Sequence, residues 1–375
     1  RSQRTRPQRN AEFRMMNKFL RAHIAQMEAY TPILPFEVLS EQLGIPAAQI
    51  VKLDANENPY GTLPAVADAL KNLPYVHIYP DPESRFLRRA LADYHQIPVE
   101  NILAGAGADE LIDLLLRFFI NPGDTILNCP PTFGMYAFDT AINGGQIIDI
   151  PRLDDFSVDA DALLDAIAEH QPKIFFLATP NNPDGGLLAP KLLDALLKQN
   201  LLLVLDEAYM EFAPPASTQI REVAKRENLI VLRTFSKWAG LAGLRVGYGV
   251  FPSWLMPYLW TAKQPYNVSV AASEAALAAL RHADQLEEIG QKIIAERERL
   301  YAELQKVDYL EPYPSQSNFI LCRVVGRDAA ALKADLAKQG ILIRYFNKPG
   351  LDDHIRISVG TPEQVDAVLK ALKKM

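Results

Sequence analysis

Residue types that act as nucleophiles or bind anions stand close together in the segment R-T-F-S-K-W-A-G-L-A-G-L-R-V-G, residues 233–247. Lys237 follows an apolar run at 229–232, which predicts a short buried strand. A lysine at a strand end is commonly a solvated surface residue, but this one has apolar neighbours on both sides. Burial near another cation favours the uncharged amine, which is a nucleophile. Ser236 and Arg245 together suit an anion such as a phosphate, so the segment indicates a phosphorylated aldehyde cofactor.

A carboxylate, Asp206, ends a second apolar run, Leu201–Leu205, and should therefore be partly buried. A buried carboxylate normally has a cationic or hydrogen-donating partner. A protonated ring nitrogen on a cofactor would serve as that partner. Asn182 follows the strand pattern at 173–178 and precedes a proline, which fits either plain turn chemistry or a pocket wall.

A strand pattern at 102–105 leads into the turn G-A-G-A-D-E and then into an apolar helix at 111–119. A strand, a glycine turn and a helix N-terminus form an anion site, because free backbone N–H groups point outward there. The turn partly follows G-x-G-x-x-G, but Glu110 stands where the third glycine is required. We therefore expect a phosphate site of mononucleotide size rather than a dinucleotide site.

Aromatic and cationic side chains near other predicted strands could complete a binding site. Phe133 follows the strand pattern at 125–128, where a ring is either part of the core or a stacking surface for a flat heterocycle. Arg344 and Arg356 both lie in apolar strand patterns near the C-terminus. One such arginine fits an exposed sheet edge, whereas two inward-placed guanidiniums indicate clamps for anionic substrate groups.

The composition is typical of a soluble globular enzyme, with 375 residues, 49% of them hydrophobic and 22% charged. A net charge of −6 and a pI near 5.6 argue against nucleic acid as a partner. Cys129 and Cys322 have no metal-ligand spacing and suggest no disulfide, so we expect a metal-free site and a reducing compartment. Apolar runs such as Leu201–Leu205 are too short to span a bilayer, so no membrane partner is expected.

Strand and helix patterns alternate through the first three quarters of the chain, which predicts a mostly parallel α/β sheet. Ligands of such sheets lie beyond the carboxyl ends of the strands. Long amphipathic helical patterns then lead into a smaller α+β region. We expect an N-terminal arm with part of the small domain at 1–50, a large domain at 51–283 and a small domain at 284–375.

Short motifs that accompany one another in one enzyme family occur here in order. They are N-E-N-P (56–59), Y-P-D-P-E (79–83), G-A-D-E (107–110), C-P-P-T-F-G-M-Y (129–136), P-N-N-P (180–183), D-E-A-Y (206–209), R-T-F-S-K (233–237), G-L-A-G-L-R-V-G (240–247) and R-I-S-V-G-T (356–361). With these motifs the chain after about Phe19 resembles the fold-type I pyridoxal-phosphate aminotransferases, and most nearly the histidinol-phosphate aminotransferase family. The resemblance implies a large domain with a mostly parallel sheet of the seven-stranded type and a smaller α+β domain.

The resemblance implies pyridoxal 5'-phosphate as cofactor and assigns roles to residues around it. Lys237 would form the internal Schiff base and carry a proton between the substrate Cα and the cofactor C4′. Asp206 would keep the pyridine nitrogen protonated. Tyr209 and Asn182 would hydrogen-bond the 3′ oxygen of the ring, and Phe133 would stack on the ring.

The cofactor phosphate would be held by residues of the glycine turn and of the lysine segment, namely Ala108, Asp109, Ser236 and Arg245. Tyr79 would reach the phosphate of a neighbouring subunit, so the resemblance also implies a homodimer.

The substrate residues implied by the resemblance come from both ends of the chain. Arg356 would bind the carboxylate of the amino-acid substrate, and Arg344 and Tyr30 would help to bind the phosphate of histidinol phosphate. Asn58 is a further expected substrate residue.

The implied reaction converts L-histidinol phosphate and 2-oxoglutarate into imidazole-acetol phosphate and L-glutamate, by a ping-pong mechanism in histidine biosynthesis. Asp184, Trp238 and Ile78 depart from the commonest family pattern, as does Phe133, where many members have tyrosine. None of these changes removes a catalytic group, but they bear on substrate choice. An aromatic amino-acid aminotransferase and a phosphothreonine-type decarboxylase share the catalytic residues and stay open as alternatives.

An alternative from another class is a non-catalytic regulator that keeps this fold. A regulator would need a nucleic-acid-binding segment, and only the basic N-terminus is available for one. That segment has five arginines and one acid in its first fourteen residues, which fits either a targeting-peptide remnant or an engineered or frayed arm. We expect a cytoplasmic protein, or a plastid protein if the segment is such a remnant.

Overall fold

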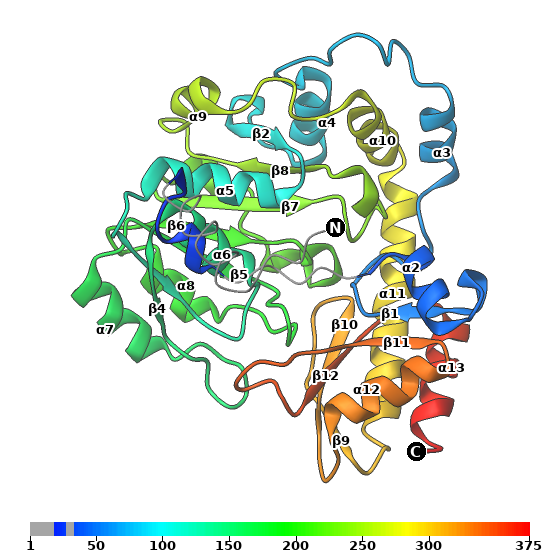
Figure 1. The fold of residues 1–375 in the computed structure, drawn as a ribbon. Coiled ribbons are helices and arrows are strands. Elements are labelled where there is room, and N and C mark those ends of the chain that lie inside the picture. The colour runs from blue at the N-terminus through cyan, green and yellow to red at the C-terminus, as the bar shows by residue number, and fades with distance from the viewer. Residues whose placement is uncertain (1–18, 28–33) are drawn as a thin grey trace, which may run out of the picture.

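The computed structural model describes residues 19–27 and 34–375, and the predicted substrate residue Tyr30 lies outside them. Figure 1 shows one sheet among helices in the N-terminal two thirds and a second sheet near the C-terminus. The helices are α2 (Phe36–Leu43), α3 (Pro64–Lys71), α4 (Arg85–His95), α5 (Ala108–Phe119), α6 (Met135–Asn143), α7 (Ala160–His170), α8 (Pro190–Leu196), α9 (Met256–Ala262), α10 (Val270–Arg281), α11 (Ala283–Leu304), α12 (Ala329–Lys338) and α13 (Pro362–Leu372). The strands are β1 (Val51–Leu53), β2 (Ile102–Gly105), β3 (Thr125–Asn128), β4 (Gln146–Asp149), β5 (Ile174–Ala178), β6 (Leu202–Asp206), β7 (Leu229–Thr234), β8 (Gly247–Val250), β9 (Leu310–Pro312), β10 (Phe319–Val324), β11 (Ile341–Tyr345) and β12 (His354–Ser358).

The larger sheet has five strands in the order β2-β8-β7-β6-β5. Strands β5, β6 and β7 are parallel, whereas β8 runs antiparallel to both of its neighbours. Strands β3 and β4 form a separate parallel pair, and β3 packs against β5. The prediction of a mostly parallel sheet is confirmed, and the expected seven strands are divided between the five-stranded sheet and this pair.

Both faces of the larger sheet are covered, which explains why its strands are continuous apolar runs. Along β6, Leu203 and Leu205 pack into one hydrophobic core, whereas Leu202 and Val204 pack into another. Successive side chains of a strand point to opposite faces, so a strand covered on both sides is apolar at every position. Asp206 is the last residue of β6 and the only charged residue of this strand.

The smaller sheet has the order β1-β11-β12-β10-β9. Its β1 pairs in parallel with β11 through Val51 and Ile341, so residues 51–53, at the start of the predicted large domain, lie in the C-terminal sheet. Strands β11 and β12 are antiparallel, and their register places Arg344 directly opposite Arg356.

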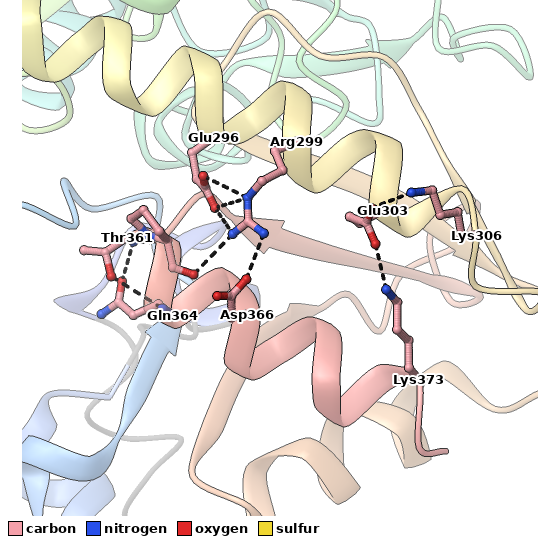
Figure 2. A network of polar contacts seen from close by, with 9 residues as sticks. Glu296, Arg299, Glu303, Lys306, Thr361, Gln364, Asp366 and Lys373 are labelled. Atoms are coloured by element: carbon pink, nitrogen blue, oxygen red, sulfur yellow. Dashed lines mark hydrogen bonds and ion pairs between the residues drawn. The ribbon is translucent and has the colours of Figure 1, made fainter.

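Helix α11 connects the two regions and is tied to α13 by ion pairs (Figure 2). Arg299 pairs with Glu296 on its own helix and with Asp366 of α13, at 2.8 Å for the latter. One turn further on, Glu303 pairs with Lys373 at 2.6 Å. Among the described residues, none of the helices is both long and apolar enough to cross a membrane.

A buried ion network lies behind the strand ends that carry Asp206 and Lys237. The Arg233 guanidinium, 4% exposed as a residue, donates to Glu207 at 2.9 Å, to Glu211 at 2.8 Å and to Thr218 at 2.9 Å. Burial alone lowers the pKa of Arg233, but the two carboxylates raise it above its ordinary value. Because Glu207 follows Asp206 directly, this network fixes the end of β6.

Replacing Arg233 should destabilise the protein more than any exposed ion pair does. In Arg233→Met the carboxylates of Glu207 and Glu211 stay buried without their cation, and we expect a loss of about 3–5 kcal/mol in the free energy of unfolding. Chemical denaturation measures this loss. The exposed pair between Lys225 and Glu222 supplies the control, since Lys225→Met should cost less than about 1 kcal/mol. Equal losses in the two variants would contradict the role of the network.

Candidate active site

A cavity of about 400 Å³ lies at the carboxyl ends of β5, β6 and β7. This is where open α/β sheets bind their ligands. The walls include the residues predicted to hold the cofactor within one chain: Ala108, Asp109, Phe133, Asn182, Asp206, Tyr209, Ser236, Lys237 and Arg245. Residues far apart in the sequence are therefore brought together as predicted.

Asp206 is a buried carboxylate at the base of this cavity, with 5% of its surface exposed. The hydroxyl of Tyr136 donates to its Oδ2 at 2.7 Å, and the Ala208 N–H donates to its Oδ1 at 3.2 Å. Burial raises the pKa of Asp206 to about 6, although the hydrogen bond from Tyr136 acts in the opposite direction. The site therefore holds a carboxylate that a nearby cation would stabilise.

Lys237 lies just beyond the end of β7 and reaches the same cavity. Its Nζ donates to the carbonyl of Ala55 at 3.2 Å and lies 5.9 Å from the centroid of the Tyr209 ring. No carboxylate pairs with this ammonium among the residues the structure describes. The amine is thus placed beside Tyr209 without a salt bridge that would hold it away from a ligand.

The N-terminus of α5 forms one end of the cavity, at Ala108. Gly107 precedes it with φ of +89°, and a Cβ there would lie 2.7 Å from the Arg245 guanidinium. Arg245 also donates to Asp109 at 2.8 Å, in a pair whose side chains are 49% and 43% exposed. Because an exposed ion pair contributes little, Arg245 can exchange it for an incoming anion at small cost.

Ser236 completes this end of the cavity. It is buried, its N–H donates to the Thr234 hydroxyl at 3.1 Å, and the Thr234 hydroxyl donates to its Oγ at 2.9 Å. Helix N–H groups, a hydroxyl and a guanidinium facing one space make a phosphate-sized anion site.

Tyr209 and Asn182 line the wall that faces the C-terminal sheet. The Asn56 amide donates to the Tyr209 hydroxyl at 3.0 Å, and Asn56 is itself fixed by Ser358 of β12. Arg356, 5% exposed, donates to the Asn182 side-chain oxygen and to the Asp54 carbonyl, the latter at 3.0 Å. Tyr209 and Asn182 are therefore held by side chains from distant segments of the chain.

The remaining predicted residues lie apart from the cavity wall. Asn58 is buried, and its amide donates to the Trp238 carbonyl at 2.8 Å, which holds the segment after Lys237. Tyr79 is 78% exposed and stacks on Tyr266 with ring centroids 4.7 Å apart, so within this chain it does not reach the cavity. Arg344 is half-buried on β11.

Comparisons with known proteins agree with this geometry. The family model of aminotransferase class I and II matches residues 48–372. A chloroplastic histidinol-phosphate aminotransferase of Arabidopsis thaliana is 53% identical over 96% of this chain and 86% of its own length. The chain belongs to aminotransferase class I and II, and within it to the histidinol-phosphate aminotransferase family. The predicted family is thereby confirmed.

Bacterial histidinol-phosphate aminotransferases are also similar to this chain. That of Roseiflexus castenholzii is 50% identical, over 95% of this chain and 98% of its own length. The crystal structure of the enzyme from Sinorhizobium meliloti, in complex with pyridoxal-5'-phosphate, is 30% identical and superposes with a TM-score of 0.85 over 94% of this chain and 96% of that one. The predicted fold-type I class is confirmed by these aminotransferase structures.

Two residues of the aminotransferase cavity region were missed in the sequence. Tyr136 is the last residue of the motif C-P-P-T-F-G-M-Y. It lies three residues after Phe133 in an amphipathic helical pattern, where an aromatic residue is typical of the core. Asn56 stands in a run that fits either a turn or a pocket edge, and its φ of +55° fits a turn, but its bond to Tyr209 was not predicted. A signal for Tyr136 existed, since its hydroxyl is the only polar group of an otherwise buried ring and needs a partner.

The cavity fits pyridoxal 5'-phosphate by its own chemistry. It pairs an anion site at one end with a buried carboxylate at the base and an amine at the side. Phe133 supplies an aromatic surface in the wall, and its ring meets the Tyr136 ring edge-on at 5.6 Å. Among the described residues, no cluster of three or more His, Cys, Asp or Glu could hold a metal ion.

Proposed function

We propose that the protein transfers the amino group of L-histidinol phosphate to 2-oxoglutarate, giving imidazole-acetol phosphate and L-glutamate, with pyridoxal 5'-phosphate as cofactor. The observation that carries this proposal is the convergence of Lys237 and Asp206 on one cavity. Beside it, Arg356 donates to the cavity residue Asn182 and lies opposite Arg344. Relatives named histidinol-phosphate aminotransferase at 43% to 53% identity support the substrate.

Pyridoxal 5'-phosphate, when bound, supplies a ring that withdraws electron density from the substrate Cα. Asp206 would hold the ring nitrogen and keep it protonated. Lys237 Nζ would hold the cofactor at rest, and in turnover it would move the proton between the substrate Cα and the cofactor C4′. Tyr209 and Asn182 would direct polar groups to the 3′ oxygen, and Phe133 would stack on the ring.

The cofactor phosphate is held by the N-terminus of α5 at Ala108 and Asp109, together with Ser236 and Arg245. The dipole of α5 and the guanidinium both favour a dianion at that position. Lys237 and Asp206 line the same cavity as this anion site, so they would face the part of the cofactor that reacts.

The substrate anion is bound by Arg356, with Arg344 beside it. The pair can serve both substrates, since Arg356 alone matches a carboxylate and the two guanidiniums together match a larger, more highly charged phosphate. Asn58 and Tyr30 are assigned to the same substrate site.

The active unit is a homodimer in which Tyr79 of one protomer reaches the cofactor phosphate of the other. The exposure of this tyrosine supports the proposal, because a ring 78% exposed in one chain is available to a partner. A domain division close to residue 283 fits the start of α11, whereas β1 at residues 51–53 lies in the C-terminal sheet, so the first division falls after β1.

For the location of the protein in the cell, we propose the cytoplasm or a plastid. The relatives from Arabidopsis thaliana and Nicotiana tabacum are named chloroplastic, which supports the second. Imaging the protein fused to a fluorescent reporter in its own cells separates the two.

Steady-state kinetics with competing amino donors tests the proposed substrate. We expect kcat/KM for L-histidinol phosphate to exceed that for L-phenylalanine by at least about 100-fold, because phenylalanine offers no phosphate to the arginine pair. A preference for phenylalanine, or carbon dioxide release from O-phospho-L-threonine, would overturn the assignment. The decarboxylation assay is included because a solved L-threonine-O-3-phosphate decarboxylase of Porphyromonas gingivalis is 27% identical, with a TM-score of 0.76.

Removing the hydroxyl of Tyr136 should shift the titration of Asp206. The hydrogen bond from Tyr136 lowers the pKa of Asp206, so in Tyr136→Phe this pKa rises above its value of about 6. We expect cofactor affinity at pH 7 to fall about 10-fold and its pH midpoint to move upward. Titration of the apoprotein with cofactor at several pH values measures both, and Tyr248→Phe, which breaks a bond to His95 away from the cavity, is the control.

A further inference from the structure

A phenylalanine on the loop after β11 contacts both arginines of the pair. The register of β11 and β12 sets Arg344 opposite Arg356, and like charges in that arrangement repel each other. The Phe346 ring centroid lies 5.5 Å from the Arg344 guanidinium and 5.6 Å from that of Arg356. The negative face of an aromatic ring attracts a guanidinium, so one ring stabilises both cations.

Arg356 is fixed by several groups, whereas Arg344 depends on Phe346. Arg356 lies 5.0 Å from the Phe319 ring and also holds Asn182 and Asp54. Within residues 19–27 and 34–375, no hydrogen bond or ion pair involves the Arg344 guanidinium. The strand register sets the two residues opposite each other, and the ring of Phe346 is the contact that holds the Arg344 guanidinium beside that of Arg356.

Phe346 is itself held in place by apolar residues. It packs against a cluster of Phe156, Leu321 and Leu351, all nearly inaccessible to solvent. Phe156 belongs to the connection between β4 and α7, and Leu321 belongs to β10. Both regions of the chain therefore fix the ring, and the ring in turn fixes the arginine pair.

The contacts continue inward to the cavity. Phe319 meets Tyr209 edge-on, with centroids 5.1 Å apart and an angle of 88° between the rings. Tyr209 lines the cavity next to Lys237. Rings and guanidiniums thus follow one another from Tyr209 through Phe319, Arg356 and Phe346 to Arg344, and the distance of Arg344 from the reactive amine is set by this series.

We propose that Phe346 is a positioning residue that determines specificity for a phosphate over a carboxylate. It keeps Arg344 beside Arg356, so that two guanidiniums meet a phosphate dianion, whereas a carboxylate is held by Arg356 alone. This inference rests on the proposed function, since it concerns the phosphate of the proposed substrate.

Phe346→Leu in the full-length, cofactor-loaded enzyme tests the role of the ring. It keeps an apolar side chain but loses the ring face, and we expect the KM for L-histidinol phosphate to rise about 5- to 30-fold. The KM for L-glutamate should change less than about threefold, as should kcat, because Lys237 and Asp206 are not touched. Phe346→Tyr, which retains the ring face, should restore the KM for L-histidinol phosphate to near the wild-type value.

Tyr345→Leu is the matched control, because Tyr345 is the neighbouring aromatic residue of β11 and packs into the main core instead. It should leave both KM values within about twofold while lowering the thermal midpoint. Cofactor absorbance should stay unchanged in all three variants. An unchanged KM for L-histidinol phosphate in Phe346→Leu, or an equal rise for both substrates, would overturn the role of Phe346. A wild-type enzyme that does not use L-histidinol phosphate overturns the proposed function instead.

Discussion

Lys237→Ala should lose nearly all turnover, by a factor of at least about 10⁴, while still binding pyridoxal 5'-phosphate. The amine is the group placed to move a proton at the substrate Cα, and alanine offers neither a nucleophile nor a base. The anion site at Ala108, Ser236 and Arg245 is not altered by the substitution, so the cofactor keeps its phosphate contacts. Steady-state rates and equilibrium dialysis with the cofactor measure the two properties separately.

Lys173→Ala is the control for this loss. Lys173 is an exposed lysine that pairs with Asp124, remote from the cavity, and its removal should leave turnover unchanged. Turnover in Lys237→Ala within tenfold of the wild-type rate would refute the role of the amine. Loss of cofactor binding together with turnover would instead show that the anion site alone does not hold the cofactor.

Asp206→Asn should reduce kcat/KM by about 10²- to 10³-fold, the range found when one preorganised electrostatic partner is removed. The amide has the shape of the carboxylate but cannot hold a proton on the ring nitrogen by its charge. The hydrogen bond with Tyr136 can persist, so the fold around the site is kept. A kcat/KM within tenfold of the wild-type value would contradict the role of Asp206.

The same substitution has the opposite effect on the stability of the cofactor-free protein. Burial raises the pKa of Asp206 from 3.8 to about 6, so ionising this group costs stability as the pH rises through that range. Asp206→Asn removes the cost, and above pH 7 the apoprotein should gain on the order of 2–3 kcal/mol over the wild type. Below pH 4 the difference should vanish. Unfolding curves at pH 4 and pH 8 measure it.

The cofactor residues could be predicted because they lie where a local pattern ends. Asp206 and Lys237 follow apolar runs, and parallel strands bring the ends of such runs to one edge of a sheet. The helix N-terminus at Ala108 was predicted for the same reason, since a strand and a glycine turn precede it. These groupings follow from strand direction alone.

The residues that were missed act across longer distances in the sequence. Tyr136 meets Asp206 only because α6 packs against α5 and β4 and so brings its ring to the end of β6. Asn56 meets Tyr209 only because β1 pairs with β11 of the C-terminal sheet. A three-residue strand such as β1 has too little pattern of its own to predict its partner. The contact of Phe346 with both arginines likewise depends on strand register, which the sequence of one strand does not contain.

The half-reaction with a single substrate tests the central claim most directly. Mixing the cofactor-loaded enzyme with L-histidinol phosphate and no acceptor should release about one equivalent of imidazole-acetol phosphate per subunit, because a ping-pong enzyme keeps the amino group until 2-oxoglutarate arrives. Adding 2-oxoglutarate should then release the same amount of L-glutamate. Lys237→Ala, mixed in the same way, should release neither product at a comparable rate. No product before the acceptor is added, or equal release by Lys237→Ala, would contradict amino transfer at this cavity.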